Sequence, residues 1–192
     1  FLDEQVKACR RETDGEDAPQ NGLGIEEIVA WPDPVDLADV LDDATDILAR
    51  YIAADSTLIL TAVLWAVHTH ILDMINVSPR LAAQAAGPGC GKTVAMEAIG
   101  NLVPRPLPAS SITAASVFRI IEEMQPTLLL DEADQMLADR HSPLVAVLNS
   151  SHRKSSASVI RMEEVLPGQF QAVQFSTWAA VMFAGIRELP PT

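Results

Sequence analysis

The chain has 192 residues, of which 48% are hydrophobic, and its formal net charge is −13. This length suffices for one domain with a sizeable core and a smaller attachment, and the composition is that of an ordinary soluble protein. The two cysteines, Cys9 and Cys90, lie far apart, which argues against a disulfide framework and favours a reducing cytoplasm. The longest apolar run, Leu58 to Val67, is too short to span a bilayer, so we expect no membrane segment.

The acidic residues are concentrated near the N-terminus. Residues 1–55 contain 15 acidic and 4 basic side chains, so they hold −11 of the net charge. The remainder is close to neutral, which neither implies nor excludes a local basic surface for DNA or RNA. We interpret residues 1–34 as an acidic segment and linker, because residues 12–24 are rich in Gly, Asp and Pro. Phe1 in place of a start methionine suggests a fragment.

Residues 35–77 are predicted to form a helical segment that packs on the rest of the chain. In residues 35–53 apolar side chains recur at helical spacing and aspartates line the opposite face, which we interpret as solvated rather than as a docking face for a basic partner. A second helix, capped by Asp55 or Ser56, is predicted to run to about Asn76. It is apolar nearly all round, so we expect it to be buried between other elements.

Residues 78–192 alternate between strand and helix patterns. We predict strands at 80–85, 105–108 and 127–130, helices at 93–102 and from Ser111 or Thr113 to 124, short helices at 134–138 and 142–151, a hairpin of 158–165 with 170–175, and a last apolar strand at 178–184. The two prolines within 105–108 remove ladder donors, so that strand must lie at a sheet edge. This alternation predicts a three-layer α/β domain with a mostly parallel sheet, preceded by the α-helical segment.

One loop in this part is close to the phosphate-binding pattern G-x-x-x-x-G-K-[ST]. It runs from Ala86, in place of the first glycine, to Thr93. The residues predicted to surround the phosphates are Gly87, Pro88, Gly89, Cys90, Gly91, Lys92 and Thr93. Backbone N–H groups of such a loop face phosphate oxygens ahead of a helix N-terminus, the lysine reaches the β- and γ-phosphates, and the threonine hydroxyl ligates Mg²⁺.

An apolar strand that ends in Asp131 and Glu132 supplies the second half of the predicted site. Asp131 is expected to hold Mg²⁺ together with Thr93, and Glu132 to orient and deprotonate an attacking water. We therefore predict Glu132 and Lys92 as catalytic residues and ATP with Mg²⁺ as ligands, since phosphoryl transfer depends mostly on positioning and charge stabilisation. The alternative interpretation of Glu132 is a surface carboxylate that follows a strand.

The loop from Gly87 to Thr93, the strand Leu128 to Glu132 and the order of elements resemble the AAA+ ATPase core. Over most of residues 38–192 the chain also resembles a family of uncharacterised domains in bacterial phage, plasmid and other mobile-element proteins, often joined to primase or helicase parts. The stretches that carry this second resemblance are residues 66–70, 78–81, 103–106, 126–132 and 184–186.

The resemblance to the AAA+ ATPase core implies several further features. The second strand should lie at a sheet edge, and the hairpin before the last strand resembles one that some helicase clades insert into a central pore. Arg153, Lys154 and Arg161 near this hairpin are then candidates for contacts with single-stranded DNA. The alternative is a plain surface hairpin with scattered basic residues. A homo-oligomer is expected for the full-length protein. The chain has Ala184-Gly185 where AAA+ proteins place Asn, Ser or Thr, and it stops before a fifth strand and lid, so we interpret residues 78–192 as a partial core.

We therefore predict an Mg²⁺-dependent ATPase that acts in DNA replication or processing for a mobile genetic element, as a helicase or translocase. The alternative is a nucleotide-dependent interaction switch with little or no hydrolysis. A small-molecule kinase ranks third, because it does not need Glu132 as a water activator.

Overall fold

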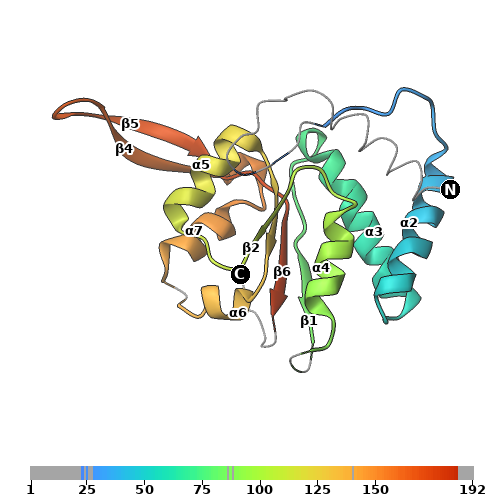
Figure 1. Cartoon of the computed structure of the whole chain (residues 1–192). Helices are drawn as coiled ribbons and strands as arrows, with labels where there is room; N and C mark the ends of the chain where they lie inside the picture. The colour runs from blue at the N-terminus through green and yellow to red at the C-terminus, as the bar shows by residue number, and fades with distance from the viewer. Residues whose placement is uncertain are drawn as a thin grey trace.

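The computed structural model describes Leu23, Ile25 and residues 28–85, 87, 89–139 and 141–185. Most of the predicted acidic segment and linker, and Ala86 and Pro88 of the predicted phosphate loop, lie outside the described residues. Within them the chain has an α/β fold. Two helices come first, followed by a parallel four-stranded sheet interleaved with helices, and a small antiparallel hairpin precedes the last strand of this sheet (Figure 1).

The elements follow one another in the predicted order. The helices are α2 (Leu37–Tyr51), α3 (Ser56–His70), α4 (Lys92–Gly100), α5 (Ala114–Met124), α6 (Ala133–Met136) and α7 (Pro143–Ser150), with short 3-10 turns η1 (Leu72–Met74) and η2 (Lys154–Ser156). The strands are β1 (Leu81–Gln84), β2 (Pro106–Ala109), β3 (Thr127–Leu130), β4 (Ser158–Leu166), β5 (Gln169–Ser176) and β6 (Val181–Gly185). The second helix is shorter than predicted, because it ends at His70 and a 3-10 turn follows.

The parallel sheet has the strand order β1-β6-β3-β2. Every residue of β3 and β6 is buried, as expected for strands that are covered on both faces. The proline-containing strand β2 lies at an edge, as predicted. The neighbouring strand β3 supplies backbone N–H donors to β2; for example, the backbone nitrogen of Asp131 donates to the carbonyl of Ala109 at 3.0 Å. The prolines of β2 are therefore not required to donate hydrogen bonds to β3.

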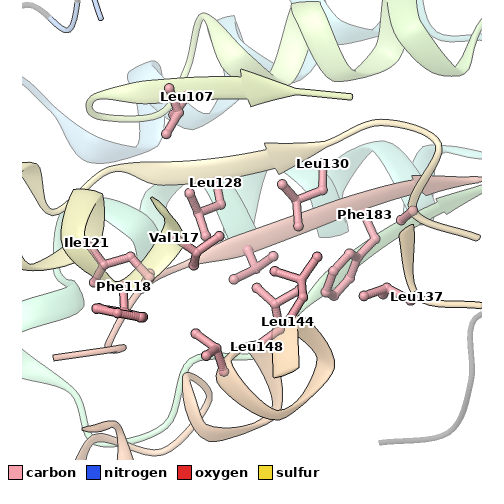
Figure 2. Packing of buried hydrophobic residues seen from close by; sticks show 14 residues of the cluster. Leu107, Val117, Phe118, Ile121, Leu128, Leu130, Leu137, Leu144, Leu148 and Phe183 are labelled. Carbon is pink, nitrogen blue, oxygen red and sulfur yellow. The ribbon is translucent and has the colours of Figure 1, made fainter. Parts of the chain in front are cut away.

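Alternate residues of β3 point to opposite faces of the sheet and join two separate cores. Leu128 and Leu130 pack in one cluster with Phe118 of α5 and Leu148 of α7 (Figure 2). Leu129 packs in the other cluster, which contains apolar residues of α2, α3 and α4. Helices therefore cover both faces of the sheet, with α2 to α4 on one side and α5 to α7 on the other (Figure 1).

The prediction that α3 is buried all round is wrong for the described part of the chain. Leu58, Leu60 and Leu64 are 60%, 44% and 51% exposed. The opposite side of α3, which includes Val63 and Trp65, lies in the cluster with α2 and α4. Apolar composition predicted burial, but a helix in the outer layer of this sandwich has neighbours on one side only.

The hairpin of β4 and β5 extends away from the sheet (Figure 1). Its turn contains Gly168 at φ +77°, a backbone conformation that favours glycine. Near its base, the rings of Phe175 and Phe118 have centroids 4.9 Å apart. Farther along β4, Glu163 forms an ion pair of 2.6 Å with Arg119 of α5. The hairpin is therefore held against α5, as packing of its inner face requires.

Candidate functional site

The predicted site residues gather at the carboxyl ends of the parallel strands. Strand β1 leads into the loop before Lys92, and β3 leads directly into Asp131 and Glu132. The central strand β6 separates these two strands and ends at Gly185. The carboxyl edge of an open α/β sheet is the usual place for a ligand, because loops from neighbouring strands meet there.

The loop reaches α4 through two glycines with left-handed backbone conformations. Gly89 has φ +75° and Gly91 has φ +77°, and no heavy atom lies within 4 Å of a Cβ built on either residue. Gly91 is the N-cap of α4, and among the residues that the structure describes no side chain forms a capping hydrogen bond at this end of the helix. The turn thus depends on backbone freedom, and the N–H groups of the first helical turn have no side-chain acceptor at this cap.

Two side chains at the start of α4 contact the surrounding loop and strand. Lys92 Nζ donates to the carbonyl oxygen of Gly87 at 3.1 Å, which keeps the ammonium group beside the loop. Thr93 Oγ1 donates to Asp131 Oδ2 at 3.1 Å, across 38 positions of sequence. The structure therefore places the hydroxyl and the carboxylate that the sequence predicts as Mg²⁺ ligands next to each other.

The backbone turns sharply after β3. Asp131 Oδ1 accepts a hydrogen bond of 2.8 Å from the backbone nitrogen of Glu132. Glu132 has φ +52°, and its side chain is exposed. A non-glycine residue in this conformation costs on the order of 1–3 kcal/mol, and such strain recurs at functional sites. Both oxygens of Asp131 are thus engaged, while Glu132 extends from a constrained backbone.

One further carboxylate, which the sequence analysis did not single out, approaches the same edge of the sheet. Asp134 of α6 lies against Gly185, so close that a Cβ on this glycine would be 2.9 Å from Asp134 Oδ1. The only local signal was its position two residues after Glu132. That spacing does not reveal contact with β6, because the contact depends on the strand order.

The three basic residues predicted to contact DNA do not form one cluster of unengaged charges. Lys154 Nζ donates to the carbonyl oxygen of Asp73 at 2.8 Å. The guanidinium carbon of Arg161, a residue of β4, lies 5.1 Å from the centroid of the Phe118 ring of α5. Arg153 is exposed and precedes η2 at the base of the hairpin.

A cavity of about 200 Å³ lies elsewhere, at the amino end of β3. Arg105, Gln125 and Trp178 contribute to its wall. It contains none of the predicted phosphate-loop or Mg²⁺ residues. We place the candidate site at the opposite strand ends, because contacts between the predicted residues occur there.

No protein-family model matches the sequence, and no curated protein matches it either. Among the helices that the structure describes, none is long and apolar enough to cross a membrane.

Proposed function

We propose that this chain is an AAA+-like P-loop core that binds and hydrolyses ATP with Mg²⁺ and serves DNA replication or processing for a mobile genetic element. The observation that carries the proposal is the 3.1 Å hydrogen bond between Thr93 Oγ1 and Asp131 Oδ2. It joins the end of the glycine-rich loop to the acidic end of a buried parallel strand. Two separate sequence patterns thus meet at one point of the fold, which chance matches to either pattern do not require.

The donor set at this point fits the proposed ligands. A hydroxyl and a carboxylate are hard oxygen ligands of the type that Mg²⁺ binds. The open space at Gly89 and Gly91 leaves room for phosphate oxygens beside the N-terminus of α4. When bound, Mg²⁺ would neutralise charge on the β- and γ-phosphates. In this proposal Thr93 and Asp131 hold the ion, and residues 87–93 surround the phosphates.

The remaining roles follow from the chemistry of the side chains. Lys92 is the cation adjacent to the loop, where it stabilises negative charge on the transferred phosphoryl group. Glu132 is the exposed carboxylate that accepts a proton from the attacking water. Its constrained backbone supports this role, because a fixed backbone limits the positions that the carboxylate samples.

A helicase or translocase role is supported by the shape of the hairpin. It extends from the body of the domain (Figure 1). The exposed Arg153 lies just before η2, which leads into β4. In this proposal Arg153, Lys154 and Arg161 contact phosphates of single-stranded DNA, and several copies of the protein surround the strand. The contacts of Lys154 and Arg161 within the domain mean that these two side chains must exchange partners on binding.

The second candidate is a nucleotide-dependent interaction switch with little or no hydrolysis. The observation that favours it is the end of β6, where Ala184 and Gly185 offer no polar side chain of their own. A switch needs nucleotide binding but no efficient water activation. Stimulation of turnover by single-stranded DNA distinguishes the two candidates, because only the motor couples hydrolysis to DNA.

The proposal is tested by measuring nucleotide binding and ATP turnover, with and without single-stranded DNA. We expect Lys92→Ala to weaken binding and Glu132→Gln to retain binding while turnover falls by about 10²-fold or more. Glu123→Gln, an exposed carboxylate of α5, is the matched control and should resemble wild type. Absence of nucleotide binding would refute the proposal, and unchanged turnover in Glu132→Gln would remove this residue from the mechanism.

A further inference from the structure

Gly185, the last residue of β6, has no side chain, and the carboxylate of Asp134 fills the space where one would lie. A Cβ atom on Gly185 would lie 2.9 Å from Asp134 Oδ1, 3.4 Å from its carboxyl carbon and 3.4 Å from its backbone nitrogen. A carbon atom and an oxygen atom do not pack at 2.9 Å without a shift. A side chain at position 185 and the observed position of Asp134 therefore exclude each other.

The strand register places this carboxylate at the sheet edge that carries the candidate site. Gly185 pairs with Gln84, the last residue of β1 before the glycine-rich loop. Phe183 pairs with Leu130, the last residue of β3. Along the sequence, Gly185 follows Phe183 by the same number of residues as Glu132 follows Leu130. Because β6 is the strand between β1 and β3, the Asp134 carboxylate lies at the end of the strand that separates the loop from the acidic pair.

The chemistry of a carboxylate restricts what Asp134 can do there. An ionised carboxylate accepts hydrogen bonds and donates none, so it cannot bind a phosphate oxygen directly. It can accept an O–H of water. Two carboxylates at one strand edge can together hold both O–H groups of a single water molecule, which leaves the lone pairs of its oxygen directed elsewhere.

We propose that Asp134 is a water-positioning residue that accepts one hydrogen bond from the attacking water while Glu132 takes the other proton. This inference rests on the proposed ATPase function. The water oxygen forms a bond to the γ-phosphorus, and the bond from that phosphorus to the β,γ-bridging oxygen breaks, with its electron pair leaving on ADP. One water proton passes to Glu132. The second stays on the new phosphate oxygen, hydrogen-bonded to Asp134, which remains ionised.

Two substitutions perturb Asp134 in different ways. Asp134→Asn removes its charge, whereas Gly185→Ala retains the charge and displaces the carboxylate by the added methyl group. We expect each to lower kcat by about tenfold to a hundredfold, with the melting temperature close to the wild-type value. Asp134→Glu should retain more activity than Asp134→Asn. Asp43→Asn, on the exposed side of α2, is the control and should leave kcat unchanged.

Calorimetric binding of ADP and ATPγS with Mg²⁺ supplies a readout that does not need turnover. The Asp134 charge should oppose the γ-phosphate, which ADP lacks. Asp134→Asn should therefore increase the affinity for ATPγS relative to that for ADP by about threefold. A purely structural role would not produce this change.

The outcomes separate this inference from the proposed function. Turnover in wild type with unchanged kcat in both variants overturns the role of Asp134 and leaves the ATPase intact. If wild type binds nucleotide without turnover, the ratio of the affinities for ATPγS and ADP tests the inference. A ratio that is the same in Asp134→Asn and in wild type overturns it. If wild type binds neither nucleotide, the proposed function fails and this inference fails with it.

Discussion

Replacing Arg80 by methionine should destabilise the fold, although the change removes a charge from a poorly solvated position. The guanidinium donates to the carbonyl oxygen of Leu148 and to Ser151 Oγ, which lies 3.3 Å from Nη2. The guanidinium carbon also lies 5.6 Å from the centroid of the Phe183 ring. Desolvation by burial lowers the pKa of Arg80, because it disfavours the charged form. The contacts and the desolvation therefore act in opposite directions.

We expect the contacts to be the larger effect, because the Arg80 guanidinium lies at the C-terminal end of α7, against Leu148 and Ser151. Hydrogen bonds from a charged donor contribute about 1.5–3 kcal/mol, and a cation at a partly buried helix C-terminus contributes up to about 2 kcal/mol. The ring contact adds about 0.5–2 kcal/mol. The free-energy cost of desolvating the charge offsets several kcal/mol of these combined contributions. The net expectation is a loss of about 2 kcal/mol for Arg80→Met and about 1 kcal/mol for Arg80→Lys, which keeps the charge without the planar donors.

Urea unfolding at a fixed pH measures these differences in the free energy of unfolding. Arg50→Met is the matched control, because Arg50 is an exposed cation in the last turn of α2. Its effect should stay within about 0.5 kcal/mol. An Arg80→Met variant as stable as wild type, or more stable, would show that desolvation outweighs the contacts and would refute this reasoning.

Three further predictions concern protonation, the loop and DNA. Desolvation by burial lowers the pKa of His68 below 6.5, so the unfolded chain binds more protons, and stability should fall as the pH falls through about 6.5. Urea unfolding should show that, between pH 7.5 and 5.5, His68→Gln loses less free energy of unfolding than wild type or the exposed control His141→Gln. Equal losses in the three proteins would contradict this prediction. Alkylation of the exposed Cys90 thiol should abolish nucleotide binding, and ATP should slow the labelling measured by mass spectrometry; equal labelling rates would defeat this prediction. Charge reversal at Arg153 and Lys154 should weaken binding of single-stranded DNA most strongly at low salt, as measured by fluorescence anisotropy, and an unchanged salt dependence would exclude these residues as phosphate contacts.

Local patterns were sufficient for much of the fold. Thr113, one of the two predicted caps, caps α5, and the helix ends at Met124 as the sequence predicted. The prolines of β2 identified an edge strand, because a residue without an N–H group cannot serve a central one. Each of these predictions depends on the chemistry of a few consecutive residues, which the sequence displays directly.

Exposure and partner choice were less predictable. The apolar composition of α3 does not say how many neighbours cover it, and Leu64 remains half exposed. The positive charge of Lys154 does not say that its ammonium group donates to the carbonyl of Asp73. Both facts depend on which element lies alongside, and the pattern within one helix or turn contains no such information.

The candidate site divides in the same way. The sequence by itself determined the glycine-rich loop, Lys92 and Thr93 at the start of a helix, and a buried strand that ends in Asp131 and Glu132. Only the tertiary structure decided that Thr93 reaches Asp131 and that Asp134 covers the bare end of β6. The physical reason is range. Backbone propensity and side-chain periodicity act over a few residues, whereas these contacts require the strand order β1-β6-β3-β2, which results from packing of the whole sheet between its two helical layers.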